Sequence, residues 1–373
     1  MPTPESFTRE AAKLPQVPLD AATAYQLHAA EMTTLVDQRL SALPDILDLI
    51  GGNPLQLMFD NHRHHAAFMA TVFTLGNYSL LAATLPWVYR AYHERGFSYD
   101  YFPRELNHWI EAVEAFMPTA LQPAIIQTYR WMIRQHEKII ELSQQQLPQL
   151  DPEAAAGSTW LERKNAFRVA ALHGDHRRCL AMVAELVQKP ADIPDFYLQV
   201  LQPVLYEVGL LWEQNKISVA HEHLVSAIVN RVMTTASLSL TEAPKGHGKV
   251  LVAACANEYH EIGAMMIADV LEFDGWEVCY LGANLPIEAL LDQARTFKPQ
   301  VVALSVTMPF NIGKAKETIE LLRRDPQLAT IKVVVGGRAF SADPDLWRQT
   351  GADACASDLK TARQLLHTLR GAA

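Results

Sequence analysis

A histidine and a carboxylate stand two residues apart in the stretch 258–263 (EYHEIG). One ring nitrogen of His260 could ligate a metal, while Glu258 could accept a hydrogen bond from the other ring nitrogen. A carboxylate in this place fixes the tautomer of the imidazole and raises its basicity. Gly263 would let the backbone approach a large ligand closely. The motif is short and occurs by chance in many proteins. Its position after a strand-like apolar run makes it a specific indication of a ligand site.

Three apolar runs of the sequence end in residues of this kind. The run 250–255 precedes the histidine stretch, a second run ends at Ser305 and Thr307, and a third ends at Gly336 and Gly337. In a parallel α/β sheet, ligand-binding loops follow the carboxyl ends of the strands. We therefore expect the three loops to form one pocket.

The segments that must position these loops begin near residue 249. Short apolar runs typical of strands alternate there with stretches of helical periodicity, which is the rhythm of βαβ units. The sequence predicts a Rossmann-like α/β domain over 249–373, with a five-stranded parallel sheet and helices on both faces. Strands are expected at 249–255, 277–281, 300–305, 331–335 and 353–357, and helices at 261–273, 286–297, 312–324, 344–350 and 358–369.

Helical periodicity dominates the chain before the sheet. Residues 158–238 fit four helices, typical of a small four-helix bundle, and residues 1–147 are helical by pattern as well. Breaks in the bundle are expected at Gly174, Pro190 and Asn215. Polar stretches with proline or glycine predict linkers at 144–157 and 240–248.

Composition limits the classes of function. The chain has 373 residues, enough for two or three domains, with 49% hydrophobic and 20% charged residues. A net charge of -9 argues against direct DNA binding, which needs a concentrated basic face. Short apolar stretches and a start without a signal pattern indicate no membrane association and a cytoplasmic protein. The four cysteines are too scattered for a disulfide framework.

The spacing of the three loops resembles the cobalamin-binding fold. Its signature is an acid-x-His-x-x-Gly stretch, then Ser-x-Leu/Thr, then Gly-Gly; here 41 residues separate Gly263 from Ser305, and 28 separate Thr307 from Gly336. The resemblance implies a base-off, His-on corrinoid, with His260 as the lower ligand of cobalt and the displaced nucleotide tail in a slot. Ser305, Thr307, Gly336 and Gly337 would line that slot. The alternative is a nucleotide-type domain with a surface histidine, although no G-x-G-x-x-G follows the first strand.

A second motif lies in the predicted bundle. Trp212 is followed, after nine residues, by Glu222 and His223, and the three could cap a flat ligand by contact and hydrogen bonding. Each alone is compatible with an ordinary core aromatic or a solvated helix start. Together they resemble the W-x9-E-H motif of CarH-type photoreceptors, which implies a bundle that covers the upper face of cobalt and surrounds an adenosyl group.

One position departs from that family. The residue after the motif tryptophan is Glu213, where the best-known photoreceptors have a histidine that captures cobalt after photolysis. His221, His223 or water could take this place, or the light state could be five-coordinate. The sequence leaves these alternatives open.

Aromatic residues are dense between Trp87 and Pro103. They indicate either an ordinary packed core or a globin-like pocket for a tetrapyrrole. The combination with a CarH-like core resembles the photocobilins, which implies biliverdin as a second chromophore, with haem as the alternative. Residues 1–178 contain no cysteine, so a bilin would be held non-covalently. Candidate propionate partners are Arg90, Arg95 and Arg104, and candidate partners of the pyrrole nitrogens are His93 and His108.

Two further expectations concern the N-terminal region and the output. We interpret the cluster 62–65 (HRHH) as a polar helix face rather than a metal site. We expect a light sensor rather than an enzyme, binding adenosylcobalamin and biliverdin and signalling as a homodimer or through a separate effector. A corrinoid carrier in methyl transfer is the main alternative. An adenosyl-radical enzyme subunit is the third, although the length leaves no room for its substrate barrel.

Overall fold

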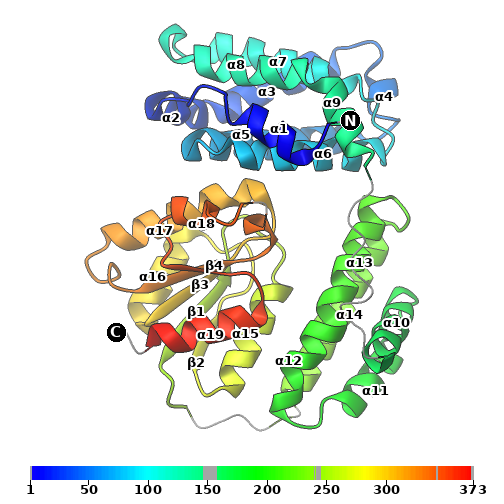
Figure 1. The fold of residues 1–373 in the computed structure, drawn as a ribbon, viewed down its shortest axis with the longest axis vertical. Helices are drawn as coiled ribbons and strands as arrows, with labels where there is room; N and C mark the ends of the chain where they lie inside the picture. The colour runs from blue at the N-terminus through cyan, green and yellow to red at the C-terminus, as the bar shows by residue number, and fades with distance from the viewer. Residues whose placement is uncertain (1, 146–157, 239, 241–244, 342, 371–373) are drawn as a thin grey trace. The chain divides into compact units, whose positions relative to one another are not determined.

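The computed structural model describes residues 2–145, 158–238, 240, 245–341 and 343–370. These residues divide into two compact units, one formed mainly by the N-terminal helices and one mainly by the later helices and the sheet (Figure 1). Most of the two predicted linkers lies outside the described residues, so the predicted domain limits stay predictions. Across the part of the chain that the structure describes, every helix is too short or too polar to span a membrane.

The N-terminal unit is helical, as the periodicity predicts. Local signals set several helix ends: Thr3 caps the first helix with Pro4 in its first turn, Asn77 caps α6, and Gly76 ends α5 in the left-handed conformation. The helices are α1 (Pro4–Ala11), α2 (Leu19–Leu27), α3 (Ala29–Ser41), α4 (Ile46–Leu49), α5 (Leu55–Leu75), α6 (Tyr78–His93), α7 (Tyr101–Phe116), α8 (Pro123–Arg134) and α9 (His136–Ser143).

The aromatic side chains between Trp87 and Pro103 pack largely on one another. Tyr89 and Phe102 stack with ring centroids 3.7 Å apart, and Phe97 meets Tyr101 edge-on at 5.2 Å. All four are buried. Such pairs stabilise a core beyond the area that they bury, which supports the packed-core interpretation for this stretch.

The 62–65 cluster is a polar helix face only in part: Arg63 and His64 are exposed as expected, whereas His62 and His65 pack against buried side chains. His62 is buried, with Nδ1 2.5 Å from Asp37 and Nε2 2.7 Å from the Tyr101 hydroxyl. His65 stacks on Trp109, and burial lowers its pKa to about 4. Among the described residues, no group of three His, Cys, Asp or Glu side chains forms a metal-ion site.

The described residues 158–238 form four main helical segments, as predicted, and the third contains a π-helical section that the sequence did not predict. The first two are α10 (Ser158–Leu172) and α11 (His176–Leu186), and the fourth is α14 (Val219–Leu238). The third is a continuous rod made of α12 (Ile193–Phe196), a π segment (Tyr197–Leu201) and α13 (Gln202–Glu213). Pro203 has no amide hydrogen for the bond that an α-helix would make to residue 199. The wider π turn lies next to this missing donor.

The sheet is parallel and five-stranded, as predicted. Its order is β2-β1-β3-β4-β5. Successive strands are added toward one edge of the sheet up to β2 and toward the other edge from β3 onward. This switch between β1 and β3 creates the crevice where such sheets bind ligands. The strands are β1 (Lys249–Ala254), β2 (Glu277–Tyr280), β3 (Val301–Ser305), β4 (Lys332–Gly336) and β5 (Ala354–Ala356), each within two residues of the predicted limits.

Helices cover both faces of this sheet (Figure 1). Small residues of α15 and α19, such as Ala264, Ala268 and Ala362, pack on the face that carries Val250 and Val252. The helices are α15 (Ile262–Phe273), α16 (Ile287–Phe297), α17 (Ile312–Arg324), α18 (Leu346–Gln349) and α19 (Leu359–Arg370).

The helical bundle shares a core with the sheet domain through α15. Met266 and Val270 of α15 are buried in the same apolar cluster as Phe196 and Tyr197 of the rod. At this contact the Tyr197 hydroxyl donates a hydrogen bond of 2.5 Å to the Asp269 carboxylate. Helix α15 begins two residues after His260, so this contact joins the bundle to the candidate site.

Asp269→Asn is expected to stabilise the protein near neutral pH. Burial raises the pKa of Asp269 from 3.8 to about 6, so the folded chain holds this proton more tightly than the unfolded chain. The contribution to the free energy of unfolding is full below about pH 4 and declines by at most about 3 kcal/mol as the pH rises past 6. Asparagine is uncharged and keeps an oxygen for Tyr197. Urea unfolding at acidic and alkaline pH measures the difference between variant and wild type, and a difference independent of pH would contradict the assignment.

Candidate functional site

The histidine loop is built around a buried carboxylate. Glu258 follows β1 and has no exposed side-chain surface, whereas the His260 side chain is 57% exposed. One oxygen of Glu258 lies 2.5 Å from Nδ1 of His260 and accepts a hydrogen bond from its backbone amide. The other oxygen accepts a bond of 2.9 Å from the amide of Thr307. One carboxylate therefore orients the imidazole and ties its loop to the loop after β3.

The same carboxylate sets the protonation of His260. Its hydrogen bond is the largest cause of a raised pKa of His260, burial opposes it, and the charges of Glu258 and Glu222 add to the rise. Nδ1 donates to Glu258, so Nε2 is the ring nitrogen left to ligate a metal. A carboxylate partner of this kind increases the basicity of a ligating imidazole.

The predicted slot residues come together at the carboxyl edge of the sheet. Ser305 pairs with Gly336 across β3 and β4. A Cβ on Gly263 would lie 3.9 Å from the Ser305 hydroxyl oxygen, in ordinary contact. The loops that carry His260, Ser305, Thr307 and Gly336 are thus adjacent, as the spacing predicts.

The absence of a side chain at Gly337 makes room for the neighbouring backbone of the protein rather than for a ligand. Its φ is +103°, and a Cβ there would lie 2.3 Å from the carbonyl oxygen of Val306. Only glycine allows this approach without displacing the loop after β3. A Cβ on Gly336 would likewise lie 2.8 Å from the carbonyl oxygen of Ala356. The sequence interpretation gave the glycine pair to the ligand, whereas at both positions the tight neighbour is the protein itself.

These residues fit a base-off corrinoid. An exposed imidazole whose Nδ1 is held by a buried carboxylate would be a suitable nitrogen donor to the cobalt of such a group. The adjoining loops offer hydroxyl groups at Ser305 and Thr307 and, at Gly263, backbone without a side chain, which suits a polar, bulky tail. His260, Gly263, Ser305 and Thr307 are the residues that would hold the group, on loops whose close packing depends on Gly336 and Gly337.

The W-x9-E-H residues lie on two consecutive helices. Trp212 is in the last turn of α13, Asn215 turns the chain with a φ of 52°, and Glu222 is in the first turn of α14. Glu222 accepts a hydrogen bond from Ser226 and lies 2.7 Å from Nδ1 of His223. Because the charge of Glu222 contributes to the raised pKa of His260, this end of the bundle is electrostatically close to the histidine loop.

The residue that departs from the motif is internal. The Glu213 side chain is only 4% exposed, so it belongs to the interior of the bundle. His221 lies 2.7 Å from the Ser218 hydroxyl through Nδ1, and His223 is 75% exposed.

The candidate tetrapyrrole residues of the N-terminal unit are mostly engaged with the protein. Arg90 donates to the carbonyl oxygen of Ser143, and Arg104 forms an ion pair with Asp45. Arg95 donates to the carbonyl oxygen of Ala91, and the His93 ring stacks on Tyr99 with centroids 4.1 Å apart.

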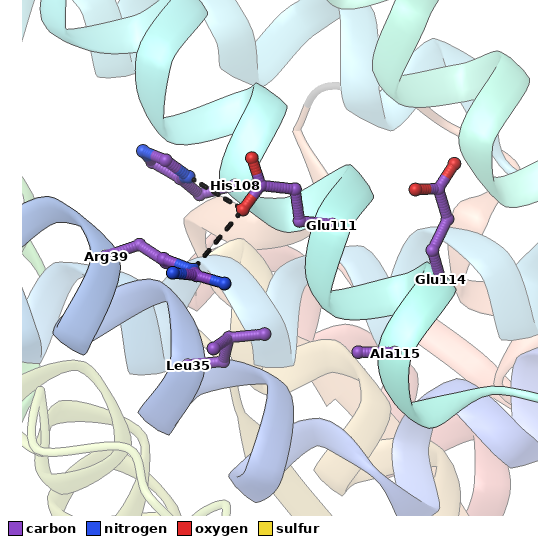
Figure 2. A pocket seen from close by; sticks show the side chains of 6 residues that line it. All are labelled: Leu35, Arg39, His108, Glu111, Glu114 and Ala115. Atoms are coloured by element: carbon purple, nitrogen blue, oxygen red, sulfur yellow. Dashed lines mark hydrogen bonds and ion pairs between the residues drawn. The ribbon is translucent and has the colours of Figure 1, made fainter.

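One of these candidates lines a surface hollow. His108 borders a hollow of about 610 Å³ between α3 and α7, together with Leu35, Arg39, Glu111, Glu114 and Ala115. Figure 2 shows Glu111 between His108 and Arg39, 3.3 Å from the former and 3.5 Å from the latter. Arg90, His93 and Arg104 do not line this hollow.

Sequence reasoning missed one loop of the site. The residues after β2 contact the histidine loop: the amide of Ala254 donates to Gly282, and that of Asn284 donates to Glu258. The signal was available, because the apolar run of β2 also ends at the carboxyl edge and Gly282 follows it. The rule applied to β1, β3 and β4 would have selected this loop too.

Comparison with known proteins agrees with this geometry. Two family models, both described as B12 binding domain, match residues 248–366 and 164–236. The transcriptional repressor CarA of Myxococcus xanthus is 31% identical over 192 residues, which are 51% of this chain and 61% of CarA. CarH of the same organism is 34% identical over 142 residues, 38% of this chain and 46% of CarH. The chain thus spans less than two thirds of either repressor.

Corrinoid proteins match the chain as well. Dimethylamine corrinoid protein 2 of Methanosarcina mazei is 26% identical over 156 residues, 41% of this chain and 72% of that protein. The structure of the monomethylamine corrinoid protein of Methanosarcina barkeri superposes with a TM-score of 0.49 at 20% identity, covering 56% of this chain and 98% of that one. The chain is therefore a cobalamin-binding protein with a helical cap before a Rossmann-like B12-binding domain, distantly related to CarA, CarH and the methylamine corrinoid proteins.

Proposed function

We propose that the protein is a light sensor that binds adenosylcobalamin. The observation that carries the proposal is the W-x9-E-H end of the cap, where Trp212 closes α13 and Glu222 acts electrostatically on His260. The cap residues of a carrier need to admit a methyl group, whereas a tryptophan with a Glu-His pair suits a larger upper group. His260 would hold the group from below, and Trp212, Glu222 and His223 would cover its other side.

The helical cap is the part of the protein that would respond to light. Adenosylcobalamin, when bound, provides a cobalt–carbon bond that visible light breaks. The cap meets the sheet domain through Tyr197, Asp269 and the apolar contacts of Met266 and Val270. A change of packing on illumination would alter these contacts. Cleavage of the cobalt–carbon bond could thereby move the cap as a rigid body relative to the sheet domain. The signal would leave through homodimer assembly or a separate effector.

The first test is an absorption spectrum of the full chain reconstituted with adenosylcobalamin, in the dark and after green light, with light scattering to follow assembly. We expect a light-dependent change of the cobalamin bands with a change in mass or shape. Trp212→Ala is expected to weaken the preference for adenosylcobalamin over methylcobalamin. An unaltered preference would remove Trp212 from the cap role, and a light-stable spectrum would contradict the sensor.

A corrinoid carrier in methyl transfer is the second candidate. It is favoured by the dimethylamine corrinoid protein of M. mazei, 72% of whose length this chain matches, against 61% for CarA. A carrier should prefer methylcobalamin and should not change assembly on illumination. The same titrations therefore separate the two functions.

We also propose biliverdin as a non-covalent second chromophore of the N-terminal unit, with haem as the rival. The absence of cysteine from residues 1–178 and a hollow bordered by His108 support a non-covalent site. The test adds biliverdin or haem to the cobalamin-loaded protein. A far-red band that survives gel filtration but not denaturation is expected, and the absence of uptake of biliverdin would remove this chromophore.

A further inference from the structure

One residue of the loop after β2, Asn284, is hydrogen bonded to three successive residues that precede His260, twice through its side chain and once through its backbone amide. The side-chain oxygen of Asn284 accepts a bond of 3.1 Å from the amide of Asn257. The backbone amide of Asn284 donates a hydrogen bond of 3.0 Å to the carbonyl oxygen of Glu258. Its side-chain nitrogen donates a hydrogen bond of 3.0 Å to the Tyr259 hydroxyl. No other contact described above acts on all three residues.

The backbone of this pair of loops depends on asparagine. Asn257 has a φ of 64° and Asn284 a φ of 52°, a left-handed conformation that asparagine tolerates better than other residues with a side chain. On the other side, the amide of Thr307 donates to Glu258. The histidine loop is thus held from both neighbouring loops of the sheet.

Asn284 itself is exposed, so its side chain adds little to the buried core. Its bonds act on the path of residues 257–259, which carries His260. We infer that Asn284 is a positioning residue that presents the His260 imidazole to the metal of the bound corrinoid. The inference rests on the proposed ligand role of His260 and adds a residue on a third loop to it.

The experiment titrates the full chain with adenosylcobalamin in the dark and follows the absorption bands. Asn284→Gly keeps the left-handed backbone and the amide bond to Glu258 but loses both side-chain bonds. We expect about 10-fold weaker binding, at the lower end of what loss of a ligand's supporting partner costs. The bands should also shift toward those of His260→Ala, because a displaced imidazole ligates less completely.

Three further variants control for other causes. Lys298→Gly replaces another left-handed residue, with a φ of 56° at the far end of α16, and should bind like the wild type. Tyr259→Phe removes one of the Asn284 contacts and should weaken binding about 2-fold. Asn284→Asp keeps an acceptor for Asn257 and for the Tyr259 hydroxyl and should recover most of the affinity.

Two outcomes would overturn the inference, and they are distinguishable. In the first, the wild type and His260→Ala have different spectra, but Asn284→Gly binds and absorbs like the wild type. Asn284 then has no positioning role, while the ligand role of His260 stands. If the wild type and His260→Ala have the same spectrum, the ligand role fails and the inference fails with it. Thermal unfolding of each variant shows whether it is folded, and Tyr259→Phe carries the test if Asn284→Gly is not.

Discussion

Replacement of His260 with alanine is expected to abolish the histidine-dependent absorption spectrum of bound cobalamin and to weaken its binding by roughly 100-fold. Loss of a carboxylate partner alone costs 10- to 100-fold at metal sites, and this variant removes the ligand itself. His260 is exposed and its loop is held through Glu258 and Asn284, so the fold should persist. Titration with adenosylcobalamin in the dark measures both effects.

A nearby histidine provides the control for this variant. His223 is also exposed and hydrogen bonded to a glutamate, but it belongs to the cap. His223→Ala should retain the histidine-dependent spectrum even if the selection of the upper group changes. Equal spectra for the wild type and His260→Ala would assign the lower face of cobalt to another group.

Gly337→Ala is expected to lower the free energy of unfolding by about 2–4 kcal/mol, a large effect for one methyl group. The added carbon meets the Val306 carbonyl oxygen at 2.3 Å, and the φ of +103° is unfavourable for any other residue. Relief requires the loop after β3 to move, which also displaces Thr307 and its bond to Glu258. Cobalamin affinity should therefore fall together with stability, as urea unfolding and titration would show.

Gly52 separates the two causes. It also has a positive φ, of +71°, but a Cβ there would meet nothing within 4 Å. Gly52→Ala should cost only the backbone term, about 1 kcal/mol. If both variants lose the same stability, the contact with Val306 is not the reason for glycine at position 337.

The sheet and its loops were predictable because the determinants are local. Apolar runs such as 301–304 and 333–335 are bounded by polar or glycine residues, so strand limits follow from the sequence. The carboxyl-edge rule then brings His260, Ser305 and Gly336 together without knowledge of any contact.

Features that depend on distant partners were not predictable. His62 is buried because Asp37 and Tyr101, both more than 20 residues away, bind its ring. The pairing of Tyr197 with Asp269 likewise joins two helices that no periodicity relates. Asn284 could have been found, but its bonds to residues 257–259 follow from the twist of the two loops rather than from its identity alone.

The continuous rod of α12, the π segment and α13 gives the cap a lever arm. Tyr197, held at Asp269, lies 15 residues before Trp212 on the same rod, a separation of roughly 22 Å at the α-helical rise per residue. A tilt of about 5° around the tyrosine would therefore move the tryptophan by roughly 2 Å. The length of the rod thus relates a displacement of Trp212 to a small rotation at α15, which the Tyr197–Asp269 hydrogen bond and the apolar contacts of Met266 and Val270 would resist.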